Sequence, residues 1–354
     1  IIMAYNRLEA SDFVVSTNTV SSTVWSQFSP SLNSYFSSSV QKEGVSGPYY
    51  LNVYQTASNV DAAEIQFAIA YGNSTGGGGV LFDANVANVT STRVIYGQYR
   101  TLLLEDENAQ FVFGSSFTGS DFYALSIERA RYKDKLLPGS MNLILSSSNS
   151  NLAALHLTDN SNMVSLPTYY GTQRAYQVIS GSNGLAWNSQ TSGSTGYTPN
   201  SGSYGLFFPD TSIILLNAAA LDDNSSAGGG INLQTVRTNT AANNPSKLYS
   251  AISGSGVVAG VTNQFELNSQ ETITSDFVFV RTKNSEFNYT ENPSFISGSS
   301  GEVIYSYFID NPQTFPTTVG LYNDGNELLA VAKMSRPLQK DFTKEALIRV
   351  KLDF

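Results

Sequence analysis

The sequence contains no cysteine, a single histidine, and few charged residues, which make up 13% of its 354 positions. An average soluble domain carries about 25% charged residues. Without cysteine, the chain has no disulfide framework, no thiolate nucleophile and no cysteine-ligated metal centre. Because His156 is the one imidazole, two-histidine metal motifs are absent, and any Ser-His-Asp triad depends on that residue. Much of the common catalytic chemistry is therefore excluded.

Basic residues are scarce as well: 19 Lys and Arg face 28 Asp and Glu, for a net charge of −9. Nucleic acid or an anionic membrane needs a concentrated basic surface, so neither is an expected partner. One basic cluster exists, formed by Arg129, Arg131, Lys133 and Lys135. The acidic residues interleaved with it favour a solvated strand end or a strip of salt bridges between subunits.

Long apolar runs are also missing. No segment approaches the ~18 residues of a membrane-spanning helix. Ile1–Phe13 lacks the basic and apolar regions of a signal peptide. We expect neither feature in this sequence, although Ile1 and Ile2 precede Met3, which leaves the true start of the chain open.

The polar residues that are present are mostly Ser, Asn and Gly, with 49, 31 and 28 copies. They bond to local backbone or tolerate positive φ angles, which favours turns and strand borders over helices. Tyr and Phe, at 20 copies each, favour strands and packed interfaces. We predict a mainly β fold of two β-sandwich-like or β-rich domains, with long polar loops and few short helices.

Composition changes along the chain predict four regions. Residues 1–47 are rich in Ser and Thr, and we expect an extended N-terminal arm that is ordered only when packed against something else. Residues 48–145 form a first β-rich domain, and residues 146–260 a loop-rich middle region. Residues 261–354 are again β-rich and are expected either to stand alone or to complete the sheet of the first domain.

Alternation of side chains predicts the individual strands. Residues 64–71 place every second residue, from Ile65 to Tyr71, on one face, which indicates a strand with one buried face. Residues 346–354 alternate in the same way, and the closing Phe354 is expected to be buried. Further strands are predicted at 49–54, 110–113, 122–129, 141–145, 204–208, 213–216, 272–281, 303–308, 318–322 and 328–334.

Turns and helices are fewer. Asn323–Asn326 predicts a hairpin, because Asp-Gly supplies the positive φ angles that such turns require. Pro209–Ser212 predicts a turn between two apolar runs. Residues 93–104 are compatible with a short helix or a buried strand, and residues 217–223 with a short helix.

Two glycine runs and two carboxylate clusters are candidate ligand sites. Gly76–Gly79 and Gly228–Gly230 lack the Lys-Ser/Thr of a phosphate-binding loop, and flexible surface loops are the better interpretation. Glu105–Glu107 and Asp222–Asp223 lack the alternating oxygen ligands and distal Glu of a calcium loop. We therefore assign no cofactor and no metal ion.

His156 is the remaining candidate catalyst. The apolar residues around it in Leu152–Leu157 favour a hydrogen-bonded histidine at a strand edge over a general base. Hydrolysis of glycans by two carboxylates needs no histidine, so composition leaves that reaction open, but no pair of acids stands out by position. We expect no catalytic residue and no enzymatic activity.

Aromatic residues in polar loops suggest a binding alternative. Trp187 and Tyr197 lie in Ser- and Gly-rich segments, where they could stack on sugars or anchor a protein interface. Sequons for N-glycosylation occur at Asn73, Asn88, Asn224 and Asn288, as chance predicts in a chain this rich in Asn, Ser and Thr.

Several stretches share a pattern with one family. TTVGLYND at 317–324, LLAVAKMSRPL at 328–338 and ALIRVKLDF at 346–354, together with residues 286–295, resemble structural proteins of large contractile-tailed phages. The likeness is closest to T4-like viruses that infect marine cyanobacteria. Residues resembling further parts of the family lie at 64–72, 96–100, 128–139 and 204–210. The resemblance implies a virion component, a wedge-type subunit of the tail baseplate, without a catalytic motif.

We therefore expect a structural protein of a phage virion that lies in the tail and is assembled in the cytoplasm of the host bacterium. Its expected partners are other tail and baseplate proteins, and further copies of itself in a symmetric assembly. The few solvated charges and many aromatic residues suit a subunit whose surface is covered by neighbours. A receptor-binding tail fibre or adhesin that recognises host surface glycans is the alternative.

Overall fold

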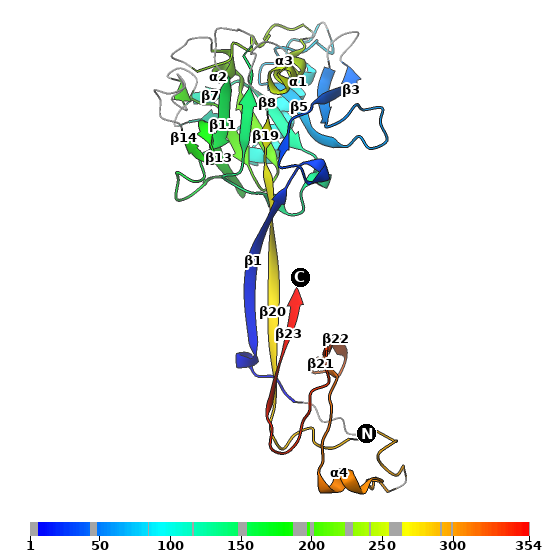
Figure 1. The fold of residues 1–354 in the computed structure, drawn as a ribbon. Coiled ribbons are helices and arrows are strands. Elements are labelled where there is room, and N and C mark those ends of the chain that lie inside the picture. Colours follow the sequence, from blue (N-terminus) through cyan, green and yellow to red (C-terminus); the bar gives the residue numbers. More distant parts are fainter. Residues whose placement is uncertain are drawn as a thin grey trace. The chain divides into compact units, whose positions relative to one another are not determined.

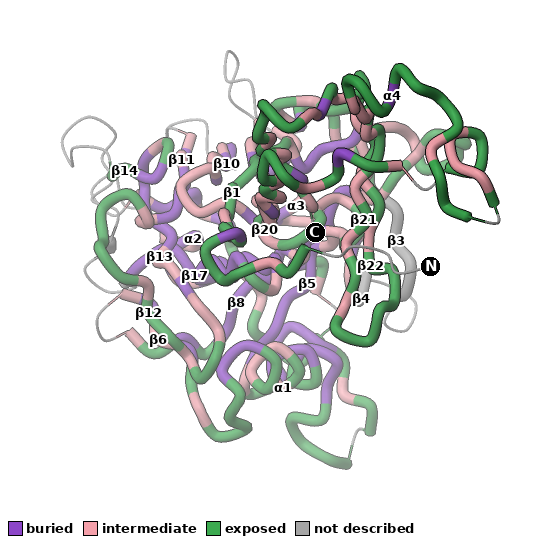
Figure 2. Tube along the Cα trace, turned by 90° about the horizontal axis from the view of Figure 1, so that it is seen from below, coloured by how far each residue is buried: buried purple, intermediate pink, exposed green. Residues whose placement is uncertain are grey.

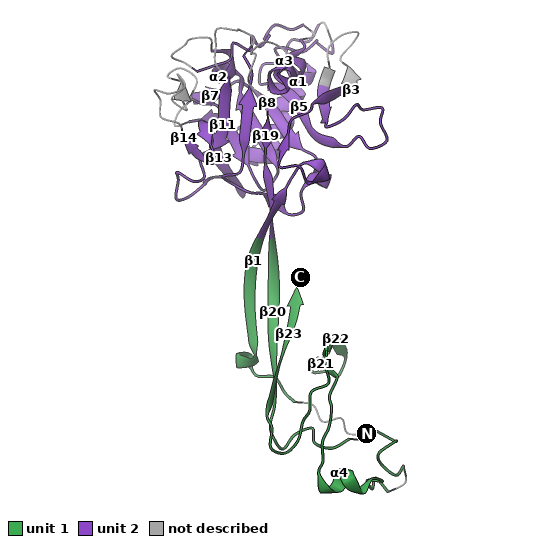
Figure 3. Cartoon of the chain, viewed as in Figure 1, with its two compact units in different colours: residues 1–19, 272–354 green, residues 20–271 purple. Residues whose placement is uncertain are grey.

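The computed structural model describes residues 6–42, 48–83, 85–114, 117–147, 154–186, 197–198, 202–223, 229–240, 242–254, 264–290, 292–298 and 300–353. Within them the chain is mainly β with few short helices, as the sequence predicts. It divides into unit 1, residues 1–19 and 272–354, and unit 2, residues 20–271 (Figure 1 and Figure 3). This division differs from the four expected regions, because strands between residues 31 and 266 share one sheet.

Unit 2 is built on one large antiparallel sheet with strand order β2-β19-β10-β11-β13-β17-β18-β8-β5-β4-β3. The bounds are β2 (Ser31–Leu32), β3 (Phe36–Lys42), β4 (Pro48–Tyr54), β5 (Ile65–Asn73), β8 (Asp121–Ile127), β10 (Asn142–Leu145), β11 (Leu155–Asp159), β13 (Gln173–Ser182), β17 (Gly205–Phe208), β18 (Ile213–Asn217) and β19 (Phe265–Glu266). Shorter strands are β6 (Phe111–Phe113), β7 (Phe117–Gly119), β9 (Lys135–Leu136), β12 (Thr168–Tyr170), β14 (Leu185–Ala186), β15 (Tyr197–Thr198) and β16 (Gly202–Ser203). The predicted turn at Pro209–Ser212 joins β17 to β18.

The centre of this sheet is buried on both faces (Figure 2). Phe67 and Tyr71 of β5 belong to one apolar cluster, whereas Ala70 belongs to a second cluster. The expectation of a single buried face for residues 64–71 is therefore wrong. Small residues on the other face of β5 let a helix pack close to the strand. A Cβ on Gly72 would lie 2.9 Å from the Phe122 ring and 3.1 Å from a backbone nitrogen of that helix.

Helices contribute to both apolar clusters. Residues 93–104, for which the sequence allows either a helix or a strand, lie in α1 (Ser91–Leu104). Ile95 and Leu103 of this helix join the second cluster. The Thr90 side chain caps this helix by accepting a hydrogen bond from the backbone of Arg93. The helices α2 (Ala218–Asp222) and α3 (Asn244–Ser253) contribute to the first cluster. No helix among the described residues is long and apolar enough to cross a membrane.

The N-terminal region contains a strand that the sequence does not predict. Its β1 (Phe13–Thr23) pairs with β20, although its Ser- and Thr-rich composition resembles a loop. The β-branched Val and Thr residues explain its extended conformation. Trp25, which follows this strand, is 3% exposed, and its ring lies 4.9 Å from that of Phe265. Residues 20–32 are thus part of unit 2 rather than of a separate arm.

Unit 1 contains the sheet β1-β20-β23, with β20 (Asn268–Thr282) in the middle and β23 (Ala346–Asp353) at one edge. The pairing of β20 with β23 runs from Ser275↔Asp353 to Thr282↔Ala346. Burial alternates along β23, as predicted, and Val350 opposite Val278 is buried. Phe354 lies outside the described residues.

The remainder of unit 1 holds a hairpin and a short helix. The predicted hairpin is confirmed as β21 (Thr318–Tyr322) and β22 (Leu328–Lys333), but the positive φ falls on Asn326, at 60°, instead of on Gly325. The strand predicted at 303–308 is wrong, because residues 306–310 form α4 (Ser306–Asp310). One turn of helix turns Phe308 toward the ring of Phe295, at 5.8 Å, and Phe308 is buried. Single 3-10 turns occur at Ala10–Asp12, Ser26–Phe28 and Arg129–Arg131.

Candidate functional site

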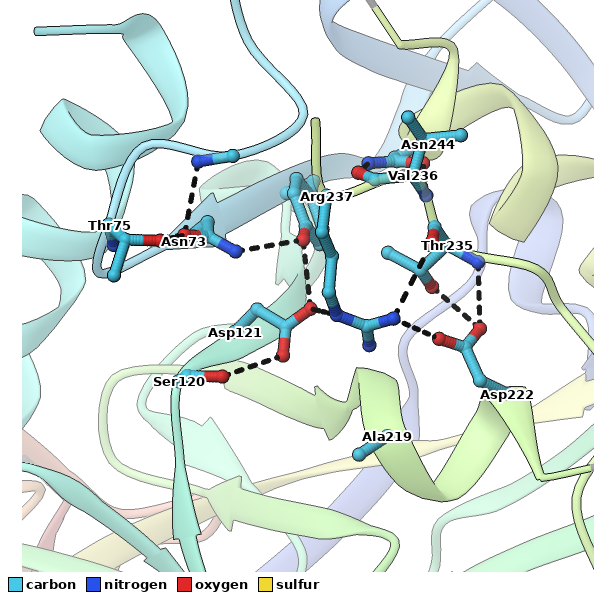
Figure 4. Close-up of polar contacts among 12 residues, drawn as sticks. Asn73, Thr75, Ser120, Asp121, Ala219, Asp222, Thr235, Val236, Arg237 and Asn244 are labelled. Carbon is cyan, nitrogen blue, oxygen red and sulfur yellow. Dashed lines mark hydrogen bonds and ion pairs between the residues drawn. The ribbon is translucent and has the colours of Figure 1, made fainter. Parts of the chain in front are cut away.

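A polar cluster at the start of β8 joins three charged side chains of unit 2 (Figure 4). Arg237 Nε lies 2.8 Å from Asp121 Oδ2, and its Nη1 lies 2.7 Å from Asp222 Oδ2. Asp222 Oδ1 also accepts from the backbone and hydroxyl of Thr235, both at 2.8 Å. Asp121 is buried and accepts from the hydroxyl of Tyr71 at 2.8 Å. One guanidinium thus forms ion pairs with two carboxylates.

The cluster has the properties of a structural tie. Burial and the neighbouring Asp121 carboxylate raise the pKa of Tyr71, so its hydroxyl stays protonated and serves as a donor. Asn73 donates to that hydroxyl and accepts from the backbone of Gly77 at 3.1 Å. General acid-base catalysis needs a carboxylate or imidazole that can reach substrate, whereas both acids here are held by Arg237.

The first glycine run is part of this tie. Gly76–Gly79 is buried, so its interpretation as a flexible surface loop is wrong. A Cβ on Gly77 would lie 2.2 Å from the carbonyl oxygen of Arg237, and the Gly78 amide donates to the Thr238 carbonyl at 2.8 Å. Only glycine permits this close approach of two backbones. In the second run, Gly228 lies outside the described residues.

The other sequence candidates do not converge on one site. His156 lies in β11, between β10 and β13, so it is on an interior strand and not at the predicted edge. Burial lowers its pKa, which favours the neutral imidazole. Glu105 follows α1 with a φ of 55° and accepts at 3.1 Å from the backbone of Thr172, far along the chain. No group of three or more metal-ligating side chains occurs among the described residues.

The basic cluster forms intrachain ion pairs. Arg131 lies 2.7 Å from Glu64, and Lys133 lies 2.9 Å from Glu271. Arg129 donates to the carbonyl oxygens of Tyr132 and Lys133. These salt bridges lie within one chain, whereas the interleaved sequence predicts a solvated strand end or salt bridges between subunits.

The alternative function, recognition of host glycans, depends on two aromatic residues whose side chains the structure does not describe. Trp187 is outside the described residues, and Tyr197 belongs to a short strand whose side chains are not described. Two of the sequons are buried instead of displayed: the side chains of Asn73 and Asn288 are hydrogen-bonded within the fold.

Unit 1 presents a different kind of site, an open groove with a volume of about 950 Å³. Its walls come from residues 6–8, from Val280 and Ile348 of the sheet, and from residues 318–324 at the hairpin. The wall includes Lys340, which is buried and donates to the carbonyl of Asn284 and to Asn288 Oδ1, both at 2.9 Å, and to the Asp341 carbonyl at 3.0 Å. These three bonds use all its protons, so Lys340 fastens the wall and has no donor left for a ligand.

Apolar side chains of unit 1 are mostly exposed. Among the described residues, its buried hydrophobic side chains are Val278, Phe308 and Val350, and all others of the molecule belong to unit 2. Its large hydrophobic side chains that remain exposed are Phe13, Val14, Val15, Phe287, Tyr289, Ile304, Tyr305, Tyr307, Ile309, Phe315, Tyr322, Leu328, Leu329, Val331, Phe342 and Leu347. Large exposed apolar patches mark interaction sites.

Two patches stand out. The aromatic tip, residues 292–311, gathers the Phe295, Tyr305 and Phe308 rings, with centroids 5.4 and 5.8 Å from that of Phe295, and exposes Tyr307 by 61%. The second patch, called the hairpin face below, comprises the exposed apolar side chains of β21 and β22, whatever side of the hairpin they lie on: Tyr322, Leu328, Leu329 and Val331. A two-stranded hairpin is marginally stable alone, so its exposed face and open edges favour a covering neighbour.

Sequence reasoning did not find this surface. The run LLAVA at 328–332 predicts a strand, and its paired leucines are the available signal, because consecutive residues of a regular strand face opposite sides and an apolar pair therefore places one side chain on each side. The sequence does not reveal that, within the described part of unit 1, no second layer covers either side of the hairpin.

The fold and the surface define a mainly β protein with a densely packed unit and a second unit that exposes apolar side chains. Comparison with protein-family models, curated proteins and solved structures finds no match to this chain.

Proposed function

We propose that the chain is a non-enzymatic structural protein that assembles through unit 1, with unit 2 as a rigid body. The exposed apolar surface of unit 1 is the observation that carries this proposal. Covering such surface is favourable by roughly 25 cal/mol per Å². Unit 1 has few buried side chains to hold it together, so contact with neighbours supplies the packing that its own residues lack.

The composition of the surface supports protein partners. Tyr, Phe, Leu and Ile dominate the exposed set, and aromatic residues are enriched at the centres of protein interfaces. The polar cluster around Arg237 and the ion pairs of Arg131 and Lys133 are satisfied within the chain, so unit 2 adds rigidity. The proposal therefore divides the molecule into a binding unit and a supporting unit.

The setting that we propose is the tail of a contractile-tailed phage, in a wedge-type position of the baseplate. The support is the resemblance of residues 317–324, 328–338 and 346–354 to structural proteins of T4-like phages. These stretches include β21, β22 and β23, which are parts of unit 1. The other resembling stretches, at 64–72, 96–100, 128–139 and 204–210, lie in unit 2, so the resemblance extends over both units.

The test is mass spectrometry of purified phage tails followed by cryo-electron microscopy. We expect the chain in stoichiometric copies, with the hairpin face and aromatic tip covered by neighbouring chains. A chain that is missing from washed particles, or that is present with unit 1 in contact with solvent, would contradict the proposal. Disrupted host envelope preparations from uninfected cells serve as the control for adventitious binding.

A further inference from the structure

Unit 1 holds a long stretch of chain with little packing. Residues 289–339 carry the aromatic tip and the hairpin face, whose large apolar side chains are mostly exposed. The two ends of this stretch meet, because Lys340 donates to the side chain of Asn288. The sequence contains no cysteine, so a disulfide cannot close the stretch. Any covalent tie at this point has to come from the amine and the amide that meet there.

Lys340 is a buried cation without a carboxylate partner. Among the residues that the structure describes, it is the single buried Lys or Arg side chain, and none of their ion pairs includes it. Lysine is almost never fully buried unless it is paired, because removing an ammonium group from water is costly. A reaction that converts this ammonium into an uncharged amide removes that cost.

The side chains of Lys340 and Asn288 are in contact and shielded from solvent. Their exposed fractions are 1% and 5%, and Lys340 Nζ lies 2.9 Å from Asn288 Oδ1. A C=O bond measures about 1.2 Å, so the amine lies within about 4 Å of Asn288 Cγ. A small turn of the lysine side chain brings the two atoms to the ~3–3.5 Å of a near-attack arrangement. The Asn284 carbonyl accepts from both Lys340 Nζ, at 2.9 Å, and Asn288 Nδ2, at 2.6 Å.

Backbone contacts hold the two residues together from the other side. Lys340 and Thr314 exchange two backbone hydrogen bonds, each 2.9 Å long. The Thr314 hydroxyl donates to the carbonyl of Phe287, the residue directly before Asn288. One threonine thus anchors both the amine and the amide. Such positioning makes the encounter of two reacting groups effectively unimolecular.

We propose that Lys340 and Asn288 form an intramolecular isopeptide bond. The lone pair of Lys340 Nζ attacks Asn288 Cγ; the Nζ–Cγ bond forms and the Cγ–Nδ2 bond breaks. Of the three protons of the ammonium group, one stays on the new amide nitrogen, and two leave with the released NH₂ group as an ammonium ion. Nothing is oxidised or reduced, and the chain becomes about 17 Da lighter through the loss of one ammonia.

Glu286 carries the proton in this reaction. A hydrogen bond from the Asn6 side chain lowers the pKa of Glu286, followed by one from the Lys283 backbone. The charge of Lys340 lowers this pKa further, so the carboxylate lies within electrostatic reach of the amine. An ionised carboxylate takes a proton from the ammonium, which frees the lone pair, and returns it to the leaving nitrogen. Lys340 also lines the open groove of unit 1, through which ammonia can leave.

The cross-link closes residues 289–339 into a loop at its base. Closing a loop removes conformational entropy from the unfolded chain, as a disulfide does. Small structures with little core commonly depend on staples of this kind. The isopeptide bond therefore supplies, without cysteine, a constraint that the sparse packing of unit 1 lacks.

Intact-mass and peptide mass spectrometry of the purified full chain test the bond. We expect wild type to be about 17 Da lighter than its sequence mass, and Lys340→Arg to have its full calculated mass, because a guanidinium does not attack. The control Lys333→Arg, at an exposed lysine, is expected to lose ammonia like wild type. Trypsin is expected to leave residues 284–333 joined to residues 334–344, since it no longer cleaves after Lys340.

Two results would overturn the bond. One is a wild-type chain with its full calculated mass after incubation at 37 °C. The other is a loss of about 17 Da that persists in Lys340→Arg, because that loss then comes from cyclisation of another amide. Both the wild-type mass and its tryptic peptides are measured without a variant, so a Lys340→Arg chain that fails to fold does not remove the test.

The role of Glu286 has a separate test. We expect Glu286→Gln to slow cross-linking by about 100-fold or more, measured as the cross-linked fraction over time in freshly synthesised chain. Glu345→Gln is the control and is expected to react like wild type. An equal rate in Glu286→Gln would overturn the assignment of Glu286 as the proton carrier.

This inference goes beyond the proposed function and does not depend on it. A purified chain without the cross-link leaves assembly through unit 1 intact as a proposal. A cross-linked chain that is missing from phage tails overturns the proposed setting and leaves the isopeptide bond established.

Discussion

Unit 2 buries its apolar side chains in two clusters on the faces of one sheet, whereas unit 1 keeps most of its apolar side chains in contact with solvent. Both units consist of antiparallel strands with alternating side chains, so local sequence does not separate them. The two units differ in whether a second layer of structure covers the sheet. Unit 2 has helices and further strands over its sheet, and a sheet that is covered gains most of its stability from that packing.

The comparison also separates the roles of polar groups. In unit 2 the buried polar cluster of Asp121, Asp222 and Arg237 joins segments that are far apart in sequence. In unit 1 a buried cation, Lys340, joins residues 284–288 to residue 341 with neutral acceptors. Hydrogen bonding therefore organises the part of unit 1 in which packing contributes little.

The sharpest test of the comparison is a matched pair of aromatic truncations. Phe122→Ala removes a ring that lies 5.0 Å from Phe111 and 5.3 Å from Tyr96 in unit 2. We expect it to lower the free energy of unfolding by about 3–5 kcal/mol. Tyr307→Ala in unit 1, at a side chain that is 61% exposed, is expected to cost less than about 0.5 kcal/mol in the monomer. Urea unfolding followed by tryptophan fluorescence measures both, and equal losses would contradict the comparison.

The next largest effect concerns the ion pairs of Arg237 with Asp121 and Asp222. Arg237→Met leaves the buried Asp121 without its cation, and we expect a loss of about 2 kcal/mol, below the 3–5 kcal/mol of fully buried pairs because Arg237 is 41% exposed. Arg174→Met is the control, since the Arg174–Asp210 pair is partly exposed and its loss is expected to cost about 1 kcal/mol or less. Chemical denaturation of the full chain measures both losses of unfolding free energy. A smaller loss for Arg237→Met than for the control would contradict a stabilising role of the Arg237 cluster.

The stability of unit 2 is expected to depend on pH through a buried carboxyl group. Burial raises the pKa of Asp159, whose carboxylate accepts from the backbone of Gly139 at 2.9 Å. Its stabilising contribution is complete below its unfolded-state pKa of about 3.9 and is lost as the pH rises through the raised folded-state pKa. We therefore expect the stability difference between wild type and Asp159→Asn to fall as the pH increases across that window. Urea titrations at a series of pH values, with Asp61→Asn as the control, measure this difference; a rise with pH would show that the sign is wrong.

The smallest effect concerns the hairpin of unit 1. Asn326 adopts a φ of 60°, which glycine accepts without a Cβ penalty. We expect Asn326→Gly to stabilise the hairpin by less than about 1 kcal/mol, visible as slower hydrogen exchange of β21 and β22 amides. Gly325→Ala, at a position without a positive φ, is the matched control and is expected to leave exchange unchanged. Faster exchange in Asn326→Gly would show that the Asn side chain itself holds the turn.

Much of the fold followed from alternation alone. Strands at 318–322, 328–334 and 346–354 were predicted closely, because period-2 patterns and turn residues are local signals. The strand β1 was missed, since Ser and Thr in an exposed strand look like a loop, and α4 was missed because a five-residue helix has no periodicity to detect. The second buried face of β5 depends on α1, which is remote information. The exposed surface of unit 1 is of the same kind: alternation at 328–333 says that a face exists, but not that nothing in unit 1 covers it.

The strands β1 and β20 lie some 250 residues apart in sequence, yet they pair. Where unit 2 begins and ends, the Ser22 and Ser269 hydroxyls are 2.8 Å apart, and the Val24 amide donates to the Leu267 carbonyl at 3.2 Å. Closing so long a loop carries an entropic cost that must be met before the pairing is gained. Once unit 2 has folded, that loop is already closed, and the two strands begin side by side. We therefore expect unit 1 to form after unit 2, and we expect damage to the unit 2 core to disturb unit 1 as well, although no residue of unit 1 has changed.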